Sequence, residues 1–514
     1  MTWARLSFAL ALVVVGLLAQ RDLSTLAYAA DNPIVIENQQ PGSGGWQLLS
    51  TASDVPGQVK GYASATSVNK GQPITFYVSV NPAQTYSIDV YRIGWYQGIG
   101  GRLLQHAGPF NGTQQASCLP SDPTTGMIAC NWLPAYTLSV PSSWTSGIYL
   151  AVLTNAQNYQ NYITFVVRDD TRVAALLYQQ SVNTYQAYNN YPDDGTAGKS
   201  LYDYNSYGAI TVGGNKGAVK VSFDRPYTDA GAGGGGGFLA WELYFVRWLE
   251  RSGYDVSYST DIDTHANGSR LLNYRGFLSV GHDEYWSKEI RDAAEGARDA
   301  GVNLAFFGAN SVYWQVRFEA SATRVANRVM VCYRDVTKDP VQGATTTVQF
   351  RQPPLNRPDQ VLVGVSFTSQ TSGNGYTSYV VMNSSHWVYA GTGFRDGDSV
   401  PGILGYETDR QWSTYPLPNS VAGSYTLLSR SPYMNINNQP DLSNSSIYQA
   451  PSGAWVFGAG TIGWSFGLDN YGFRNSANAG IQQATANILN KFISSGGQSV
   501  IAAPSNLTAT AGVS

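Results

Sequence analysis

The sequence has few charged residues, few histidines and few cysteines for a chain of 514 residues. Charged residues make up 13% of it, about half the share usual in soluble domains, and the formal net charge is −3. No strongly basic field is present, which argues against a nucleic-acid-binding protein. Three cysteines are too few for a scaffold built from disulfides. Low charge combined with 43% hydrophobic residues also argues against a disordered chain.

Long hydrophobic runs are missing as well, apart from one near the N-terminus. Arg5 precedes an apolar run from Phe8 to Ala19, and small residues follow at Ala27, Ala29 and Ala30. The run is too short to span a bilayer comfortably, since about 20 residues are needed. We therefore expect residues 1–30 to be a cleaved signal peptide and the mature protein to be secreted, extracellular or periplasmic, without a membrane span. The alternative is an uncleaved anchor.

The cysteines fit this compartment. Cys118 and Cys130 bracket a loop rich in proline and glycine, and in an oxidising compartment they are placed to close it with a disulfide. Cys332 lies in an apolar run, which favours a buried free thiol over a nucleophile.

What the chain has in abundance is glycine and tyrosine, 54 and 34 residues, arranged in two kinds of pattern. From residue 32 to 169 apolar residues alternate with polar ones, as at Ile74, Phe76, Val78 and Val80. Runs of period two separated by turn residues predict an immunoglobulin-like β-sandwich.

From residue 170 to 498 strand and helix patterns alternate. This order is typical of a doubly wound α/β sheet, and β-type patterning from about 345 to 465 predicts additional strands. The last residues, 499–514, are interpreted as a linker or the truncated start of a fibronectin type III-like module. The predicted strands are 172–178, 255–258, 276–280 and 302–307, and the predicted helices are 238–251, 288–300 and 479–494.

Polar side chains follow three of these strands. His282 and Glu284 come after the strand at 276–280, Asn310 follows the strand at 302–307, and Tyr185 follows the first strand. In open α/β sheets ligands bind outside the carboxyl ends of the strands, so we expect these groups to share one rim. The purely structural alternative is that Glu284 and its neighbour Asp283 only cap the next helix, for which Ser287 is also a good N-cap.

A glutamate with one or more tyrosines offers hard, anionic oxygen ligands, which suit a hard metal ion such as ferric iron. His282, two residues from Glu284 in an extended loop, would project to the same side. It is therefore a candidate acid or base beside the metal.

Several longer motifs resemble one family. The sequence is similar to the C-terminal domain of the large (beta) subunit of N,N-dimethylformamidase and its secreted relatives, over most of residues 85–495. The motifs that carry the resemblance are YRIGWYQGIGG (91–101), NTYQAYN (183–189), SLYDY (200–204), the stretch 238–317 with GHDEYW and FFGANSVYW, GILGYETD (402–409) and GTIGWSFGLD (460–469).

The resemblance implies a fold of the glutamine-amidotransferase class and a mononuclear iron held by two tyrosines and one glutamate. In this sequence Glu284 matches the carboxylate ligand. Tyr185 and Tyr202 are the predicted tyrosine ligands, with Tyr188 and Tyr204 as near alternatives.

The resemblance also implies catalytic residues and a reaction, hydrolysis of an amide by activated water. Glu407, in the Gly-Tyr-Glu motif, or His282 would take the proton of the water, and Asn310 would donate a hydrogen bond to the developing oxyanion. Since export is expected, the substrate need not be a formamide. A small-molecule or glycan-linked amide is predicted, and the chain could act as a homo-oligomer.

The sequence also offers two rival functions. Gly463–Gly467 fits the G-x-S-x-G pattern of serine hydrolases, but the last histidine, His386, precedes Ser465, which is the wrong order for that fold. The second rival is a non-catalytic carbohydrate-binding or adhesion protein, for which 13 tryptophans and 34 tyrosines would supply an aromatic groove.

Overall fold

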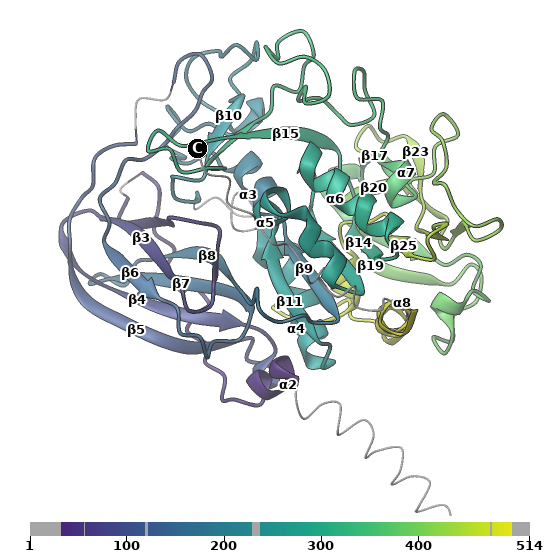
Figure 1. Ribbon diagram of the computed structural model, residues 1–514. Coiled ribbons are helices and arrows are strands. Elements are labelled where there is room, and N and C mark those ends of the chain that lie inside the picture. Colours follow the sequence, from purple (N-terminus) through teal and green to yellow (C-terminus); the bar gives the residue numbers. More distant parts are fainter. Residues whose placement is uncertain (1–31, 56, 119–121, 229–236, 473–474, 496–514) are drawn as a thin grey trace, which may run out of the picture.

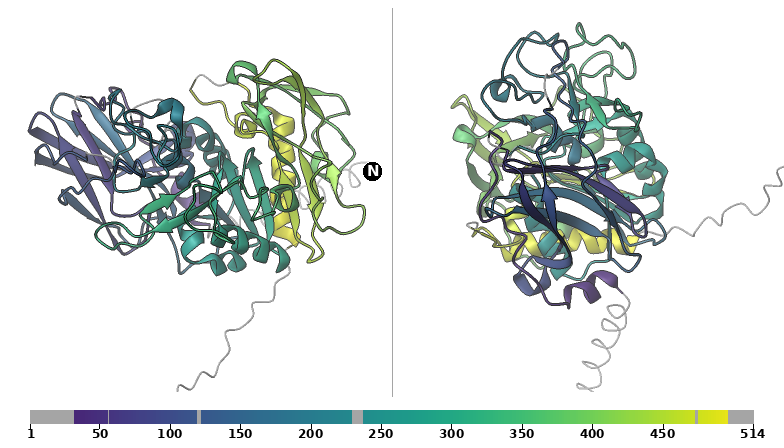
Figure 2. Two further views of the ribbon diagram at one scale, coloured as in Figure 1. Left: turned by 90° about the horizontal axis from the view of Figure 1, so that it is seen from above. Right: turned by 90° about the vertical axis from the view of Figure 1, so that its left-hand side faces the viewer.

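The computed structural model describes residues 32–495, except 56, 119–121, 229–236 and 473–474 (Figure 1). The predicted signal peptide and the predicted C-terminal linker lie outside the described residues. The architecture is mixed α/β, with more strands than helices. Seen from above, the first β-sheets, the helix-flanked sheet and the late strands follow one another from left to right (Figure 2). Within the described residues we find no helix that is both long and apolar enough to cross a membrane.

The first part of the chain forms two β-sheets after a short helix, α2 (Pro33–Asn38). Side chains of alternating residues such as Phe76, Ile88 and Phe165 meet in one core between the sheets, as the period-two pattern predicted. The smaller sheet has the order β1 (Val59–Ala63), β3 (Pro73–Val80), β6 (Tyr136–Ser139). The larger sheet has the order β2 (Ser67–Asn69), β8 (Gln160–Arg168), β7 (Gly147–Asn155), β4 (Gln84–Ile93), β5 (Gly101–Gly112).

The cysteines behave as the sequence predicted. A disulfide joins Cys118 to Cys130 and closes the loop between β5 and β6. Cys332 is a buried free thiol, and burial raises its pKa to about 12, so it is not a reactive thiolate.

The second part is built on a seven-stranded sheet. The first five strands of the order pair in parallel and the last two pairings of the order are antiparallel, so the predicted parallel sheet with added strands is confirmed. The order is β11 (Val256–Thr260), β9 (Leu176–Gln180), β12 (Gly276–Gly281), β14 (Asn303–Gly308), β25 (Trp455–Gly458), β24 (Ser446–Gln449), β21 (Thr426–Leu427).

Helices cover both faces of this sheet, because its strands are apolar on both sides. Along β12, Leu278 and Val280 face the core that holds α4 (Leu243–Arg251) and α8 (Ala479–Ser495), whereas Phe277 faces the core of α6 (Lys288–Asp299). Continuous apolar runs are what a parallel sheet covered on both faces requires.

The remaining elements surround the carboxyl edge of the sheet or form small sheets beside it. The helical elements are η1 (Tyr96–Gly98), α3 (Val182–Tyr188), η2 (Asp203–Asn205), η3 (Phe238–Glu242), α5 (Asp261–Ala266), η4 (Gly268–Asn273), α7 (Gln360–Val363), η5 (Ser372–Asn374), η6 (Trp387–Tyr389) and η7 (Trp464–Gly467). The strands are β10 (Lys220–Ser222), β13 (Tyr285–Ser287), β15 (Trp314–Glu319), β16 (Val329–Val331), β17 (Ser366–Gln370), β18 (Tyr376–Val380), β19 (Ser399–Gly405), β20 (Glu407–Arg410), β22 (Ser431–Met434) and β23 (Pro440–Ser443).

Two predicted elements differ from the structure. The strand predicted at 172–178 begins only at Leu176, because Arg172 pairs with Asp255 and the amide of Ala175 donates to the same carboxylate. The helix predicted at 238–251 opens with a π-helical turn, η3, before the α-helix proper.

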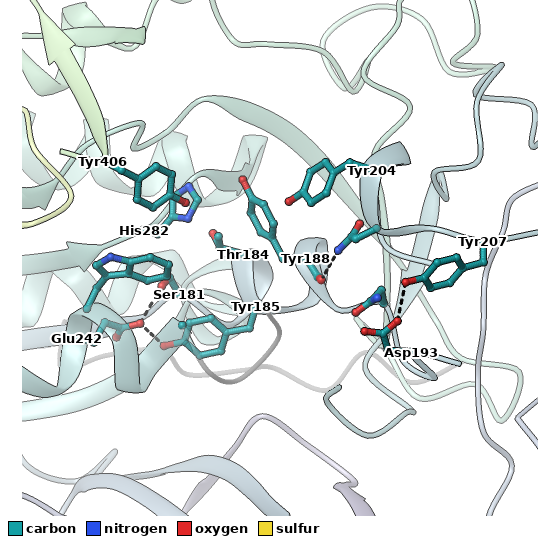
Figure 3. Close-up of a pocket in the computed structure, with 14 residues that line it drawn as sticks. Ser181, Thr184, Tyr185, Tyr188, Asp193, Tyr204, Tyr207, Glu242, His282 and Tyr406 are labelled. Atoms are coloured by element: carbon teal, nitrogen blue, oxygen red, sulfur yellow. Dashed lines mark hydrogen bonds between the residues drawn. The ribbon is translucent and has the colours of Figure 1, made fainter. Parts of the chain in front are cut away.

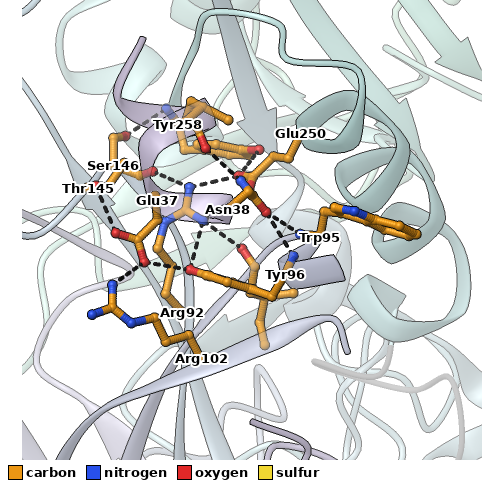
Figure 4. A network of polar contacts seen from close by, with 12 residues as sticks. Glu37, Asn38, Arg92, Trp95, Tyr96, Arg102, Thr145, Ser146, Glu250 and Tyr258 are labelled. Atoms are coloured by element: carbon orange, nitrogen blue, oxygen red, sulfur yellow. Dashed lines mark hydrogen bonds and ion pairs between the residues drawn. The ribbon is translucent and has the colours of Figure 1, made fainter. Parts of the chain in front are cut away.

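A buried ion pair joins the two parts of the chain (Figure 4). Arg92 on β4 donates to both carboxylate oxygens of Glu250 on α4, at 2.9 and 2.7 Å, and both side chains are fully buried. Asn38 on α2 and the hydroxyl of Tyr258 on β11 also donate to Glu250, each at 2.8 Å. Groups from three elements, β4, α2 and β11, therefore satisfy this carboxylate, and they hold α4 against all three.

Replacing Arg92 should destabilise the whole protein, because Arg92→Met leaves the carboxylate of Glu250 buried without its cation. We expect the free energy of unfolding in urea to fall by about 3–5 kcal/mol. Lys220→Met, which removes the partly exposed partner of Glu319, is the matched control and should change it by less than about 1 kcal/mol. Equal effects of the two substitutions would contradict the importance of the buried pair.

Candidate functional site

The carboxyl ends of β9, β12 and β14 lie side by side, and the chain that leaves each of them builds the site. Gly281 at the end of β12 pairs with Gly308 at the end of β14. A Cβ atom at Gly308 would lie 2.1 Å from the carbonyl oxygen of Gly281, so only glycine permits this approach. The predicted common rim is therefore confirmed, with His282 and Glu284 following one strand and Asn310 the next.

Glu284 lies at the centre of a cluster of phenol groups. The hydroxyl of Tyr188 donates to Glu284 Oε2 at 2.9 Å, and the hydroxyl of Tyr202 lies 3.2 and 3.3 Å from its two carboxylate oxygens. The two hydroxyls are 2.9 Å apart, and the rings stack with centroids 4.4 Å apart. Tyr285 adds a third phenol, which hydrogen-bonds to Tyr202. We call Glu284, Tyr188 and Tyr202 the oxygen cluster.

His282 links this cluster to Glu407. Its Nε2 lies 3.1 Å from Glu284 Oε2 and 3.0 Å from Glu407 Oε2. All three side chains are buried. Gln370 donates to the other oxygen of Glu407 at 3.3 Å and so orients this carboxylate.

Burial and neighbouring charges act on the ionisation of these groups. Burial raises the pKa of Tyr188 and Tyr202 well above the ordinary value, and the charge of Glu284 raises it further. Burial alone would lower the pKa of His282, but the carboxylates of Glu407 and Glu284 outweigh it and raise the pKa to about 10. Without a further cation, the phenols are therefore protonated and the imidazole is charged at neutral pH.

Tyr185, predicted as a metal ligand, points elsewhere. Its hydroxyl donates to Glu242 Oε1, and Ser181 and Tyr178 donate to the same carboxylate at 3.0 and 2.7 Å. Burial raises the pKa of Glu242 to about 7 in spite of these hydrogen bonds. The structure thus brings Tyr202 and the near alternative Tyr188 to Glu284, and it does not bring Tyr185 there.

The other predicted residues take separate positions. The backbone amide of Asn310, in a left-handed conformation with φ of 55°, donates to Asp409 at 2.8 Å, two residues from Glu407. The side-chain oxygen of Asn310 is buried without a hydrogen-bond partner in the part of the chain that the structure describes. Tyr204 packs against Tyr202 with ring centroids 5.4 Å apart but is 73% exposed, so it is not part of the oxygen cluster.

The simpler alternative for Glu284, a helix cap, does not hold. Ser287 caps α6 by accepting a hydrogen bond from the amide of Ile290 at 3.2 Å. The amide of Glu284 instead donates to Thr184 on α3 at 3.0 Å, which ties the segment after β12 to the helix that carries Tyr188. Ser465, of the G-x-S-x-G match, is fully buried in η7.

A cavity of about 330 Å³ opens beside the oxygen cluster (Figure 3). His282 and Tyr406 lie at one end of it in this view, and Asp193 and Tyr207 lie at the other, with Tyr188 between them. Its lining includes Trp241, Tyr204 and Glu242. A molecule in this cavity would therefore touch His282 directly.

The donor set of the oxygen cluster fits a hard metal ion. Two phenol oxygens and a carboxylate converge within hydrogen-bonding distance of one another, and such oxygens are the ligands that ferric iron prefers. In the described ranges there is no group of three or more His, Cys, Asp or Glu side chains placed to hold a metal. The oxygen cluster has a different composition, because two of its three side chains are tyrosines.

Sequence reasoning missed two residues near the site, Tyr285 and Glu242. Tyr285 directly follows Glu284, and it reaches the oxygen cluster only through its hydrogen bond to Tyr202, which is distant in sequence. Glu242 left a signal: it precedes Val246 by four residues and Leu249 by seven, so an acid occupies the apolar stripe of the helix. An acid in such a stripe indicates a buried, hydrogen-bonded carboxylate.

Two of the solved structures that match parts of this chain do so only weakly. The N-terminal domain of mmIFT52 matches 49% of this chain and 89% of its own, with 9% identity and a TM-score of 0.24. A cycloisomaltooligosaccharide glucanotransferase of Paenibacillus sp. matches 77% of this chain and 66% of its own, with 10% identity and a TM-score of 0.17. These likenesses are too weak to carry a functional argument.

Sequence comparisons are more informative. The N,N-dimethylformamidase beta subunit of Alcaligenes sp. is 25% identical over an alignment of 424 residues that covers 71% of this chain and 54% of that protein. The chain thus spans about half the length of the curated relative it matches. The family model described as N,N-dimethylformamidase beta subunit-like, C-terminal, matches residues 87–478, which include the oxygen cluster, His282 and Glu407. The chain belongs to this family.

Proposed function

We propose that the protein is a secreted, iron-dependent amide hydrolase whose metal is held by Glu284, Tyr188 and Tyr202. The observation that carries the proposal is the convergence of two phenols on one buried carboxylate, 2.9–3.3 Å apart, beside a cavity that Tyr188 and His282 line. Ferric iron bound there would supply a Lewis acid for the amide carbonyl and would acidify a water molecule.

The residues around the oxygen cluster would handle the protons. Glu407, held by Gln370, faces His282 at 3.0 Å, so the pair can accept the proton of the attacking water and return it to the departing amine. The amide side chain of Asn310 is the candidate donor to the oxyanion. The backbone amide of Asn310 is held by Asp409, which lies two residues after Glu407 in the chain. Trp241 and Tyr406 wall the cavity beside His282 and would exclude water from the reacting bond.

The finer points of fold and assembly belong to the same proposal. We infer an immunoglobulin-like arrangement of residues 32–169 and a glutamine-amidotransferase-like arrangement of residues 170–498. The matched relative is named as a subunit, which is compatible with a homo-oligomer or with further chains. Family membership gives no support to the rival function, a carbohydrate-binding or adhesion protein.

The metal ligands can be tested by substitution. We expect the purified protein to contain stoichiometric iron and a phenolate-to-iron absorption band in the visible. Tyr188→Phe and Glu284→Ala should each remove most of the iron, because each removes a ligand oxygen. Elemental analysis and the visible spectrum measure the result.

Tyr185→Phe is the matched control. Tyr185 lies on the same helix as Tyr188, three residues before it, and its hydroxyl donates to Glu242 and not to Glu284. This variant should retain both the iron and the band. Loss of iron in Tyr185→Phe with retention in Tyr188→Phe would reverse the ligand assignment, and wild-type protein without iron would refute the metal site.

The role of Glu407 in proton transfer can be tested separately from metal binding. Glu407→Gln should keep the iron but lower kcat/KM for an amide substrate by about 100-fold or more, because the amide cannot accept the proton of the water. N,N-dimethylformamide, the compound in the name of the relative, is the first substrate to try. Glu319→Gln, an exposed carboxyl outside the site, should leave both quantities unchanged. A Glu407→Gln protein with more than half of the wild-type rate would exclude the proposed role.

A further inference from the structure

The cavity beside the oxygen cluster is larger than a formamide of a few heavy atoms requires. Its volume of about 330 Å³ is roughly ten times the ~30 Å³ that one water molecule occupies in the liquid. It extends from His282 and Tyr406 past Tyr188 to Asp193 and Tyr207 (Figure 3). A substrate whose amide reacts beside His282 thus has room for a group as large as an aromatic ring.

The lining of the cavity distinguishes between charges. Aromatic side chains form much of the wall, among them Tyr188, Tyr204, Trp241 and Tyr406. Among the described residues that line it, two are carboxylates and none is Lys or Arg. Aromatic faces and carboxylates both attract cations. The cation in the lining, the imidazolium of His282, lies at the opposite end of the cavity from Asp193, so the Asp193 end favours a cationic group over an anionic one.

The two carboxylates differ in what they can still bind. Glu242 already accepts hydrogen bonds from three hydroxyls, those of Tyr178, Tyr185 and Ser181. Asp193 accepts one side-chain hydrogen bond, from Tyr207 at 2.7 Å, and forms no ion pair with a Lys or Arg in the described ranges. It is only partly buried, at the end of the cavity opposite to His282. Asp193 is therefore an anion that a ligand can reach and neutralise.

We propose that the cavity selects amides that carry a protonated amine at the end remote from the reacting bond. The ammonium group would pair with Asp193 and Tyr207, and a flat or apolar spacer would lie between the faces of Tyr188, Tyr204 and Trp241. This inference rests on the proposed amide hydrolase function, and it names the substrate class of that same site.

Three formamides with one ring test the proposal. N-(4-methylbenzyl)formamide, its 4-aminomethyl analogue and its 4-carboxy analogue share the reacting bond and the ring, and their remote substituents are neutral, cationic and anionic. We expect kcat/KM to be about tenfold higher for the ammonium compound than for the neutral one, and lowest for the carboxylate. The preference should shrink as salt is added, because screening weakens a partly exposed ion pair.

Asp193→Asn should bring the ratio of ammonium to neutral substrate close to one. Asp194→Asn is the matched control: Asp194 is the next residue, it does not line the cavity, and its acceptor bonds to Thr196 and Ala197 can be kept by asparagine. The ratio should persist in this control. An equal ratio in Asp193→Asn and wild type, or a preference for the neutral or anionic amide, would overturn the inference.

Binding of the three compounds, followed by the fluorescence of Trp241 and the other tryptophans, separates this inference from the proposed function. If none is hydrolysed but the ammonium compound binds most tightly and loses this advantage in Asp193→Asn, hydrolysis of these amides is refuted and the cation-selective cavity stands. If the compounds are hydrolysed or bound without charge preference, the cation-selective cavity is refuted and the proposed hydrolase is not affected.

Discussion

The structure depends on burying glutamate carboxylates among tyrosine hydroxyls. A carboxylate removed from water must be hydrogen-bonded or paired with a cation, because an isolated buried charge costs many kcal/mol. Tyr188 and Tyr202 donate to Glu284, Tyr178 and Tyr185 donate to Glu242, and Tyr258 donates to Glu250. Phenol hydroxyls therefore donate hydrogen bonds to all three of these buried carboxylates.

The three carboxylates differ in what else they meet, and that difference separates structure from function. Glu250 also meets Arg92, so its charge is neutralised and it joins two parts of the chain. Glu242 meets only hydroxyls among its hydrogen-bond donors, and its pKa rises to about 7. Glu284 meets two phenols and His282 beside an open cavity, where a metal ion can take the place of the phenol protons.

The architecture places these groups through a simple geometric rule. Parallel strands end at one edge, so the segments after β9, β12 and β14 meet there although they are more than a hundred residues apart at the extremes. Hydrogen bonds such as that from the amide of Glu284 to Thr184 then fix the segments to one another. Glu407 arrives from β20, outside the seven-stranded sheet, and completes the group by facing His282.

Much of the α/β sheet and of the rim that carries the site could be predicted from the sequence, because strand and helix periodicity are local properties. The apolar runs and the N-cap at Ser287 gave β12, β14 and α6 to within a residue or two, and the positions of His282, Glu284 and Asn310 at strand ends followed from that. The start of β9 was missed because a side chain distant in sequence, Asp255, holds Arg172 out of the strand.

The sequence by itself determined that a glutamate, a histidine and several tyrosines share one rim, and which family the chain resembles. Only the tertiary structure decided which tyrosine of α3 meets Glu284. Tyr185 and Tyr188 are three residues apart on one helix, so both are near the site in sequence terms. The packing of η3 and α4 places Glu242 against Tyr185 and leaves Tyr188 to Glu284. The choice depends on where a second helix lies, and no local pattern contains that information.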